Sequence, residues 1–321
     1  MCLTPQALPY AVGKNTEVFI SYFAIISIMF KEGLIKTDLE VLQLVLYKKM
    51  NITRIATELG KSLSWTSECV SHLAEIGLID LEKKGISKFV TLSSNSLGKN
   101  LSLLMTESTH LNLNKILTGS GLLILPLLLE PGSKPEDISV SVSRSLRTIK
   151  DALVRWNSMG VVILEKKTGL YSLNPRQNYL LQFVVAYSEF RNKSMQKELI
   201  SDAIIVWQWR DEFLVSIPYQ IEHPQFIAAA ASRLDELGYE ILHTSHYYFY
   251  SPKLDKVSKE EAFVQTIKTN PENPRIFRLI REEIKDNMIK KKNIQDYAKK
   301  YGIEAIIDHK EAYNDQQKRI R

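Results

Sequence analysis

The sequence predicts a mainly α-helical protein with a small amount of β structure, an α+β fold in which a module of three helices and a two-stranded hairpin occurs twice. Three observations support this fold class. A segment recurs within the first two hundred residues, each copy changes from helical periodicity to strand alternation, and the last third mixes short strands with helices. The 321 residues correspond to two or three domains of ordinary size. A content of 45% hydrophobic and 24% charged residues excludes disordered, collagen-like and coiled-coil chains.

We expect four segments along the chain. They are an N-terminal extension with an apolar helix (1–34), a first module (35–110), a second module with a trailing helix (111–195) and a small α+β sensing or interaction domain (196–321).

The N-terminal extension contains the longest apolar stretch, residues 18–30. This stretch is interrupted by two serines and is shorter than the roughly 20 residues that cross a bilayer. Glu17 beside it and the lack of a small-residue cleavage site argue against a secretion signal. Cys2 and Cys69 are too few for a disulfide framework, which agrees with a reducing compartment. We therefore expect a buried helix, no membrane contact and a cytoplasmic protein, associated with the nucleoid if it binds DNA.

The internal repeat has a constant offset of 83 residues. The segment LAEIGLIDLEKKG at 73–85 recurs as WNSMGVVILEKKTG at 156–169. The same offset relates Gly77 to Gly160, Leu81 to Leu164, Val70 to Leu153, Ser62 to Ser145 and Ile55 to Ile138. Because a chance match would not keep both the glycine and the hairpin spacing, the two segments are treated as copies of one module.

Each copy predicts the same order of elements from its apolar periodicity, capping residues and glycines. The first copy predicts a helix over 38–50 capped by Thr37, a helix over 53–59 ended by Gly60, a helix over 64–76 capped by Ser64 and ended by Gly77, and a hairpin over 78–92. The second copy predicts a helix over 121–129, a helix with Ser133 as cap and Pro135 in its first turn, a helix over 145–158, and a hairpin over 161–173 that turns at 166–169.

The order of three helices and a two-stranded wing resembles the winged helix-turn-helix family of DNA-binding domains, over about residues 35–95 and 118–175. The resemblance implies that the third helix of each copy enters the major groove of double-stranded DNA. Charge agrees with it: basic residues exceed acidic ones by 11 to 9 in residues 1–100 and by 12 to 8 in 101–200, and they balance at 19 each in 201–321. The net charge of +6 and the pI near 9.0 suit a polyanionic partner without requiring one.

The candidate DNA-contacting residues are polar side chains on the outward face of each third helix, in the turn before it and in the wing. In the second copy they are Arg144, Ser145, Arg147, Thr148, Lys150, Arg155, Lys166 and Lys167. In the first copy they are Lys61, Ser64, Trp65, Ser67, Lys83, Lys84 and Lys88.

The second copy is expected to bind DNA more strongly, because the third helix of the first copy contains no Arg or Lys. Arg144 and Arg147 are predicted to contact bases, since a guanidinium fork on guanine O6 and N7 discriminates by about 1–3 kcal/mol. The wing lysines are predicted to contact phosphates. The alternative for the wings is a solvated turn. The alternative for the first copy is a protein-contact helix that presents Trp65, Glu68 and His72.

A helical apolar pattern follows each wing, of the kind that packs on a partner helix. The two patterns are Leu97, Leu101 and Leu104 in the first copy, and Tyr179, Leu180, Phe183, Val184 and Tyr187 in the second. Homodimerisation through one of them or through residues 18–30 is one hypothesis, and packing within a domain is the other.

The C-terminal third begins after the polar stretch 189–198, which predicts a domain boundary. The expected elements are strands over 203–209 and 213–217, a helix over 225–237 ended by Gly238, a strand over 239–250, helices over 259–269, 274–288 and 293–301, the last ended by Gly302, and an amphipathic piece to about 313.

No catalytic or metal-binding pattern stands out in this third, and we expect neither an enzyme nor a bound cofactor or metal. His243 and His246 would lie on opposite faces of a regular strand, so one ion could not take both. Asp211 and Glu212 are interpreted as solvent-facing turn residues. Phosphate-binding glycine loops and the HExxH, CxxC and GxSxG motifs are absent from the sequence.

The segment NPENPR…FRLIREEIKDN…DYAKKYGIE is similar to the AbiEi-type antitoxins, regulators associated with nucleotidyltransferases, over about residues 200–313. The similarity rests on Asn273, Pro274 and Arg275 before a helix and on Tyr301 and Gly302 at the end of another. It implies a protein partner or repression of the protein's own operon.

The sequence favours a sequence-specific double-stranded DNA-binding transcriptional regulator. Two other hypotheses stay open. One is a winged-helix interaction or antitoxin-like protein without strong DNA binding of its own. The other is a nucleic-acid-processing enzyme, which would need an acidic metal cluster that the spacing does not supply.

Overall fold

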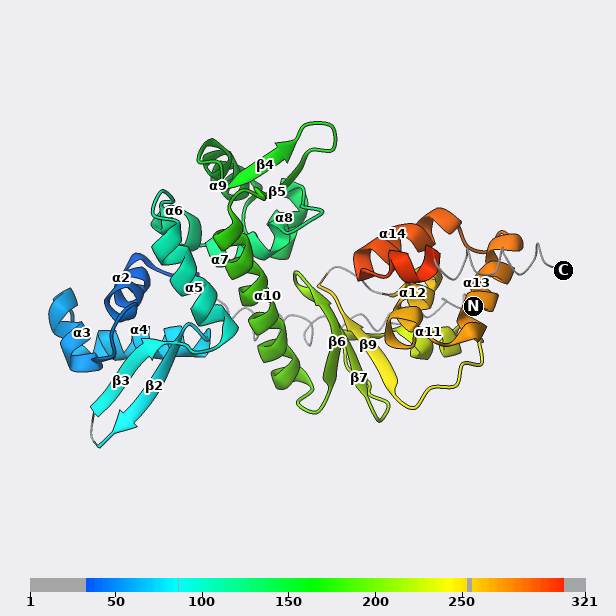
Figure 1. The fold of residues 1–321 in the computed structure, drawn as a ribbon, viewed down its shortest axis with the longest axis horizontal. Helices are drawn as coiled ribbons and strands as arrows, with labels where there is room; N and C mark the ends of the chain where they lie inside the picture. The colour runs from blue at the N-terminus through cyan, green and yellow to red at the C-terminus, as the bar shows by residue number, and fades with distance from the viewer. Residues whose placement is uncertain (1–32, 86, 253–255, 309–321) are drawn as a thin grey trace, which may run out of the picture. The chain divides into compact units, whose positions relative to one another are not determined.

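The computed structural model describes residues 33–85, 87–252 and 256–308, and it is a mixed α+β structure (Figure 1). The chain divides into two compact units, Met1–Leu125 and Pro126–Arg321, and each is described here by itself. This division falls inside the predicted segment 111–195. The predicted helix at 18–30 lies outside the described residues. Among the residues that the structure describes, no helix has the length and apolar character needed to span a membrane.

The first unit contains the first copy of the repeat. Its elements are α2 (Lys36–Val45), β1 (Met50–Asn51), α3 (Ile52–Leu59), α4 (Leu63–Glu75), β2 (Ile79–Lys84), β3 (Ser87–Leu92), α5 (Ser96–Glu107), α6 (Leu113–Leu117) and α7 (Gly121–Ile124). The strands form an antiparallel sheet in the order β1-β3-β2, with Met50 opposite Val90 and Ile79 opposite Leu92. Ile55, Val70 and Leu73 are fully buried, as the apolar stripes of α3 and α4 predict.

Two predicted caps in this unit are wrong. Ser62, not Ser64, caps α4: its Oγ accepts a hydrogen bond from the Trp65 N–H at 3.2 Å. At the start of α2, Asp38 Oδ2 accepts the Ile35 N–H at 2.8 Å, so Thr37 is not the cap. The predicted helix over 38–50 ends at Val45, because Met50 and Asn51 pair with β3 instead.

The second unit begins near the 3-10 helix η1 (Leu125–Leu128) and contains the remainder of the second copy. Its next elements are α8 (Pro135–Ser141), α9 (Leu146–Ser158), β4 (Val162–Glu165), β5 (Leu170–Leu173) and the 22-residue helix α10 (Asn178–Leu199). Ser133 is not the cap of α8, which starts after Lys134 without a side-chain cap. Ser133 instead exchanges two backbone hydrogen bonds with Tyr171 of β5, each 2.9 Å long.

The two copies keep the 83-residue offset at the level of single hydrogen bonds. Helices α4 and α9 have 13 residues each and start at Leu63 and Leu146. In the turn before them, Lys61 N–H donates to Ala56 O at 3.0 Å, and Arg144 N–H donates to Ser139 O at 3.2 Å. After them, Gly77 and Gly160 both have the left-handed backbone that ends a helix, with φ of 74° and 68°.

The rest of the second unit is an antiparallel sheet with helices against it (Figure 1). Its elements are β6 (Ile204–Trp209), β7 (Glu212–Ile217), β8 (Phe226–Ala228), α11 (Ala230–Glu236), β9 (His246–Tyr250), α12 (Lys259–Thr269), α13 (Pro274–Lys285) and α14 (Lys291–Tyr301). The strand order is β6-β7-β9-β8. Leu214 and Phe249 of the sheet, with Phe263 and Ile267 of α12, belong to one buried apolar cluster.

Three expectations for this region need correction. The apolar run 225–237 is not one helix, because residues 226–228 pair with β9. The strand expected over 239–250 covers only His246–Tyr250. His243 therefore lies outside the strand, and its ring centroid is 5.5 Å from that of His246, so the two rings are neighbours rather than on opposite faces.

The polar stretch 189–198, which was expected to mark a domain boundary, lies in the second half of α10. Ser188 and Asn192 are buried, and their side chains donate hydrogen bonds to the carbonyl oxygen of Arg210, between β6 and β7. Gln196 is buried too and donates to Ile200 O at 2.6 Å. These residues are polar because they satisfy backbone groups inside the fold.

Candidate nucleic-acid interface

Helix α9 separates its apolar and basic residues onto two faces. The side chains of Ile149, Leu153 and Trp156 are at most 2% exposed, and the basic residues point outward. The outward residues predicted to contact DNA are all exposed: Arg144, Ser145, Arg147, Thr148, Lys150 and Arg155. A surface of this kind leaves the cations of α9 available to a polyanion.

The two strongest base-contact candidates differ in what holds them. Arg147 is 92% exposed, and its Nε lies 4.0 Å from Asp151 Oδ2, a distance at which the side chain is nearly unconstrained. Arg144 forms no ion pair with any described residue, but its backbone carbonyl accepts the Ser139 hydroxyl at 2.6 Å. The turn therefore fixes the Arg144 backbone and leaves its side chain in solvent.

Lys150 forms an ion pair with an acidic residue of α8. Its Nζ lies 3.4 Å from Glu136 Oε1. The pKa of Glu136 is lowered by a hydrogen bond to its own backbone N–H, by Lys150 and by the nearby Lys134, despite partial desolvation. Lys134 is exposed and was not among the predicted residues.

Ser145 and Thr148 have a structural role in the same surface. Ser145 Oγ accepts the Thr148 N–H at 3.1 Å, and the two hydroxyl oxygens are 2.8 Å apart. This is the N-cap of α9. Both side chains remain exposed beside Arg147 in the sequence.

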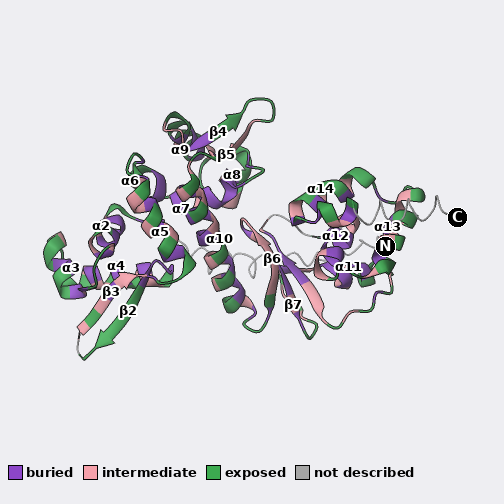
Figure 2. Cartoon of the chain, viewed as in Figure 1, coloured by how far each residue is buried: buried purple, intermediate pink, exposed green. Residues whose placement is uncertain are grey.

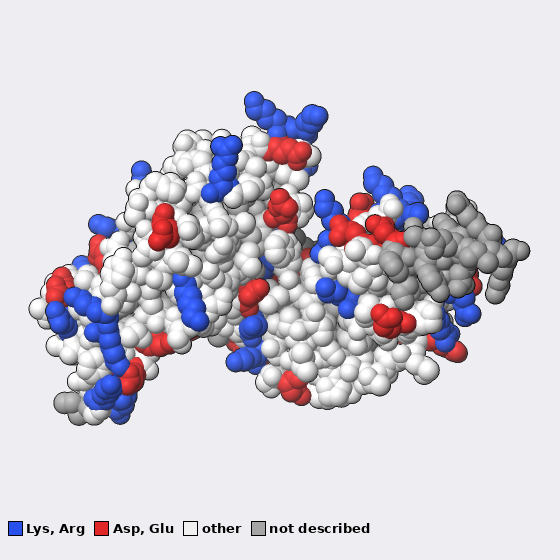
Figure 3. All heavy atoms as spheres, viewed as in Figure 1, with Lys and Arg blue, Asp and Glu red and all other residues white. Residues whose placement is uncertain are grey.

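The tips of both hairpins are basic and exposed (Figure 2). Lys166 and Lys167 lie at the tip between β4 and β5, and they form no ion pair within the described part of the chain. Lys83, Lys84 and Lys88 lie at the tip between β2 and β3. On the face shown in Figure 3, basic side chains gather at each of these tips.

Lys49, directly before β1, places an additional cation beside the first hairpin, one that the sequence did not single out. Lys49 pairs with Glu82, and its Nζ also lies 5.3 Å from the centroid of the Phe89 ring. Lys84 Nζ is 3.3 Å from the same Glu82 carboxylate. Glu82 thus compensates part of the charge at this tip, which leaves the first hairpin less positive than its lysine count implies.

Helix α4 has a different surface from α9. Ser64, Glu68 and Ser71 are exposed, and Trp65 and Ser67 are half-buried. Lys61 Nζ lies 5.7 Å from the Trp65 ring centroid, a cation–π distance. This helix presents hydroxyls, an indole and carboxylates, and the cation of Lys61 in the turn before it lies over the indole.

His72, which was expected to be presented outward, is half-buried and lies beside the buried carboxylate of Asp38. Its Nδ1 lies 3.6 Å from Asp38 Oδ2, and Asp38 is 1% exposed. Cys69 Sγ donates to Asp38 Oδ1 at 2.9 Å. Burial raises the pKa of Asp38, but the hydrogen bonds from His72, Cys69 and Ile35 outweigh it and lower that pKa overall. Burial and Asp38 raise the pKa of the Cys69 thiol well above its usual range, so this cysteine is a protonated structural group.

The two apolar stripes considered for dimerisation are buried. Leu97, Leu101 and Leu104 on α5 are at most 2% exposed, and Leu180, Phe183, Val184 and Tyr187 on α10 are at most 3% exposed. These seven side chains are covered by their own chain, whereas Tyr179, the remaining residue of the second stripe, is half-buried.

Two residue pairs of the C-terminal third were considered for metal or acid–base chemistry, His243 with His246 and Asp211 with Glu212. Within the described ranges, no group of three or more His, Cys, Asp or Glu side chains is arranged to hold a metal ion. Asp211 and Glu212 are not solvent-facing as expected. Asp211 is 8% exposed, and Glu212 accepts the Ser251 hydroxyl at 2.8 Å and lies 3.0 Å from Lys300 Nζ.

Comparison with known proteins adds no assignment. No protein-family model matches this chain. A search of curated proteins gives no significant match either.

Proposed function

We propose that this protein is a sequence-specific double-stranded DNA-binding transcriptional regulator with tandem winged helix-turn-helix domains. The observation that carries the proposal is the basic outward face of α9, in a helix-turn-helix geometry that recurs 83 residues apart. A helix in the major groove contacts base edges with its outward side chains, and the wing and flanking groups contact phosphates. The exposed residues of α9 and of the β4–β5 tip supply both kinds of contact.

The two copies are proposed to have different tasks. At the position of Arg147 the first copy has Ser64, and at the position of Lys150 it has Ser67. The first copy therefore lacks the cations that would attract α4 into a groove, and its phosphate contacts are left to the β2–β3 tip. Sequence preference is assigned to the second copy.

The test is selection of genomic DNA fragments with the purified full chain at about 150 mM salt, where non-specific binding is weakened. Enrichment of one motif is the expected result. Retention of fragments without a common motif would contradict sequence specificity. In a matched selection with the Arg147→Ala protein, the enriched motif should lose its base preference at one position.

A second candidate function is that of a protein-interaction or antitoxin-like regulator that binds DNA weakly. The surface of α4 favours it, because the exposed Glu68 and Glu75 repel phosphate and the half-buried Trp65 is a residue type common at protein interfaces. It predicts only weak DNA binding, without a preferred motif, at about 150 mM salt. Tight binding of one enriched motif at that salt concentration would reject this candidate.

A further inference from the structure

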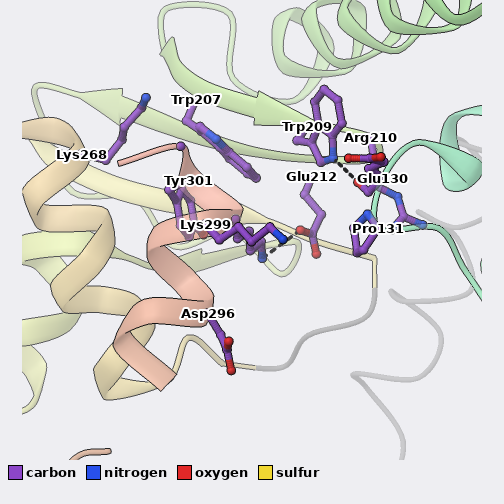
Figure 4. A pocket seen from close by; sticks show the side chains of 12 residues that line it. Glu130, Pro131, Trp207, Trp209, Arg210, Glu212, Lys268, Asp296, Lys299 and Tyr301 are labelled. Carbon is purple, nitrogen blue, oxygen red and sulfur yellow. Dashed lines mark hydrogen bonds and ion pairs between the residues drawn. The ribbon is translucent and has the colours of Figure 1, made fainter. Parts of the chain in front are cut away.

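A cavity of about 670 Å³ opens in the second unit between the β6–β7 hairpin, the end of α14 and the loop before α8 (Figure 4). Its volume lies in the range of sites for small molecules, roughly 300–1,000 Å³. The cavity has no part in the proposed DNA contacts, and its walls combine aromatic rings with charges of both signs. This combination defines the kind of molecule that would fit.

The aromatic wall is formed by Trp207 and Trp209 of β6 together with Tyr301 of α14. The two tryptophans are two residues apart on one strand, a spacing that places side chains on the same face of a sheet. The Trp207 ring centroid is 4.4 Å from that of Tyr301. Trp209 Nε1 donates to Glu130 O at 2.8 Å, which fixes the second indole in place. Rigid indoles of this kind stack on flat aromatic groups.

One cation at the cavity is already compensated. Lys300 Nζ lies 3.0 Å from Glu212 Oε2 and 2.8 Å from Glu261 Oε1. Burial lowers the pKa of Lys300, but these two carboxylates outweigh it and raise that pKa overall, so the ammonium is retained. Because Lys300 is held by its carboxylates, it forms a fixed part of the wall.

Four other charged side chains line the cavity without such compensation. Lys268, Lys299, Glu130 and Asp296 form no ion pair with any residue in the described ranges. Two cations and two anions around one aromatic cavity match a ligand that has both an anionic group and an amine. The three lining carboxylates would repel a strongly anionic ligand, and the lysines would repel a purely cationic one.

We propose that this cavity binds a small zwitterionic ligand with a flat aromatic ring, the chemical class of the aromatic amino acids. The ring stacks on the indoles, the carboxylate lies near the lysines, and the ammonium lies near Asp296. Specificity comes from the requirement for both charges, because the analogue that lacks one of them leaves a charged wall unpaired.

The site is connected to the second copy of the repeat. The loop residues Glu130 and Pro131 line the cavity and lead into α8. The Arg210 guanidinium, also at the cavity, bonds to Leu127 O, Gly132 O and Ser133 Oγ. Ser133 in turn pairs with Tyr171 of the wing. An occupant that shifts this loop changes the position of the wing, and a consequence for DNA affinity follows only if the proposed function is correct.

The test is isothermal titration calorimetry on the full chain without DNA, so that its outcome is independent of DNA binding. The probes are L-tryptophan and L-phenylalanine, with tryptamine and phenethylamine as the analogues that lack the carboxylate. Indole-3-propionate and 3-phenylpropionate lack the amine, and adenosine monophosphate is the anionic aromatic comparison. We expect an amino acid to bind with Kd below about 1 mM, and each single-charge analogue at least about tenfold more weakly.

Two variants test the contributions of a lining cation and a lining anion separately. Lys299→Glu should weaken the amino acid and the propionate by about tenfold or more. Asp296→Asn should weaken the amino acid without weakening the propionate. Lys292→Glu, on the same helix but outside the cavity, is the matched control and should change nothing. Equal affinity for zwitterion and analogues, tighter binding of adenosine monophosphate, or no binding of any probe would overturn the proposal.

Discussion

Ser143 in the second copy occupies the position that Gly60 has in the first, and both have a left-handed backbone, with φ of 51° and 62°. Each residue lies in the turn before the outward-facing helix. A side chain in this conformation costs roughly 1–2 kcal/mol, which glycine avoids. The second copy therefore keeps the turn of the first against an unfavourable local preference.

Ser143→Gly should raise the free energy of unfolding by up to about 1 kcal/mol, because it removes that backbone cost. The reciprocal change Gly60→Ala should lower it by about the same amount. A Cβ at Gly60 meets no atom within 4 Å, so the backbone alone would account for the loss. Urea unfolding midpoints measure both effects, and a destabilised Ser143→Gly protein would contradict the strain assignment.

Ser145→Ala should destabilise the second unit by about 1 kcal/mol, since it removes the N-cap of α9. Ser62→Ala should do the same in the first unit through α4. Asp at either position accepts the same hydrogen bond and should restore most of the stability. Amide hydrogen exchange in the first turn of each helix locates the effect, and unchanged protection in the alanine variants would argue against these caps.

Arg147→Ala should cost about 1–3 kcal/mol of binding free energy on the selected DNA motif and little on random DNA. Lys166→Ala should weaken all sequences alike and reduce the slope of log affinity against log salt by about one. Fluorescence anisotropy at several salt concentrations measures both quantities. Equal losses on specific and random DNA for both variants would reject the division between base and phosphate contacts.

Arg210→Met should destabilise the second unit by about 3 kcal/mol, because it leaves buried carbonyls of the loop before α8 without their charged donor. The loss should appear as faster amide exchange at Tyr171, whose N–H donates to Ser133 O. The exposed Arg176→Met is the control. An unchanged exchange rate at Tyr171 would show that the hydrogen bonds of Arg210 do not stabilise the pairing of Ser133 with the β4–β5 hairpin.

Tyr250 makes stability depend on alkaline pH. Burial raises its pKa from 10.0 to about 12, with Asp211 adding to the rise and Arg191 opposing it. The folded state thus binds the phenolic proton more tightly than the unfolded state, so this contribution is complete below pH 10 and is lost as pH rises towards 12.

Tyr250→Phe should therefore flatten the decline in unfolding free energy between pH 10 and 12, by up to about 2 kcal/mol. Urea titrations at pH 7 and about pH 11 measure the difference. Tyr47→Phe, at a tyrosine that is 80% exposed, is the comparison. Parallel declines for the wild type and Tyr250→Phe would show that this phenol does not titrate with unfolding.

The sequence by itself determined the repeated module, because the signals that define it are local. Gly77 and Gly160 end helices through their own backbone freedom, and Ser145 lies directly before the helix that it caps. The exposed, basic character of α9 was also predictable, since its apolar residues recur with helical spacing and leave Arg147 and Lys150 outside.

Only the tertiary structure decided which polar residues are buried and where short apolar runs pair. Asp38 forms a hydrogen bond with Cys69, 31 positions away in the sequence, and Arg210 forms one with Ser133, 77 positions away. Local sequence patterns do not relate residues with such separations. Residues 226–228 became a strand because β9 lies beside them. Partners that are distant in sequence supply these hydrogen bonds, so burial of a charge and assembly of the cavity depend on the folded chain as a whole.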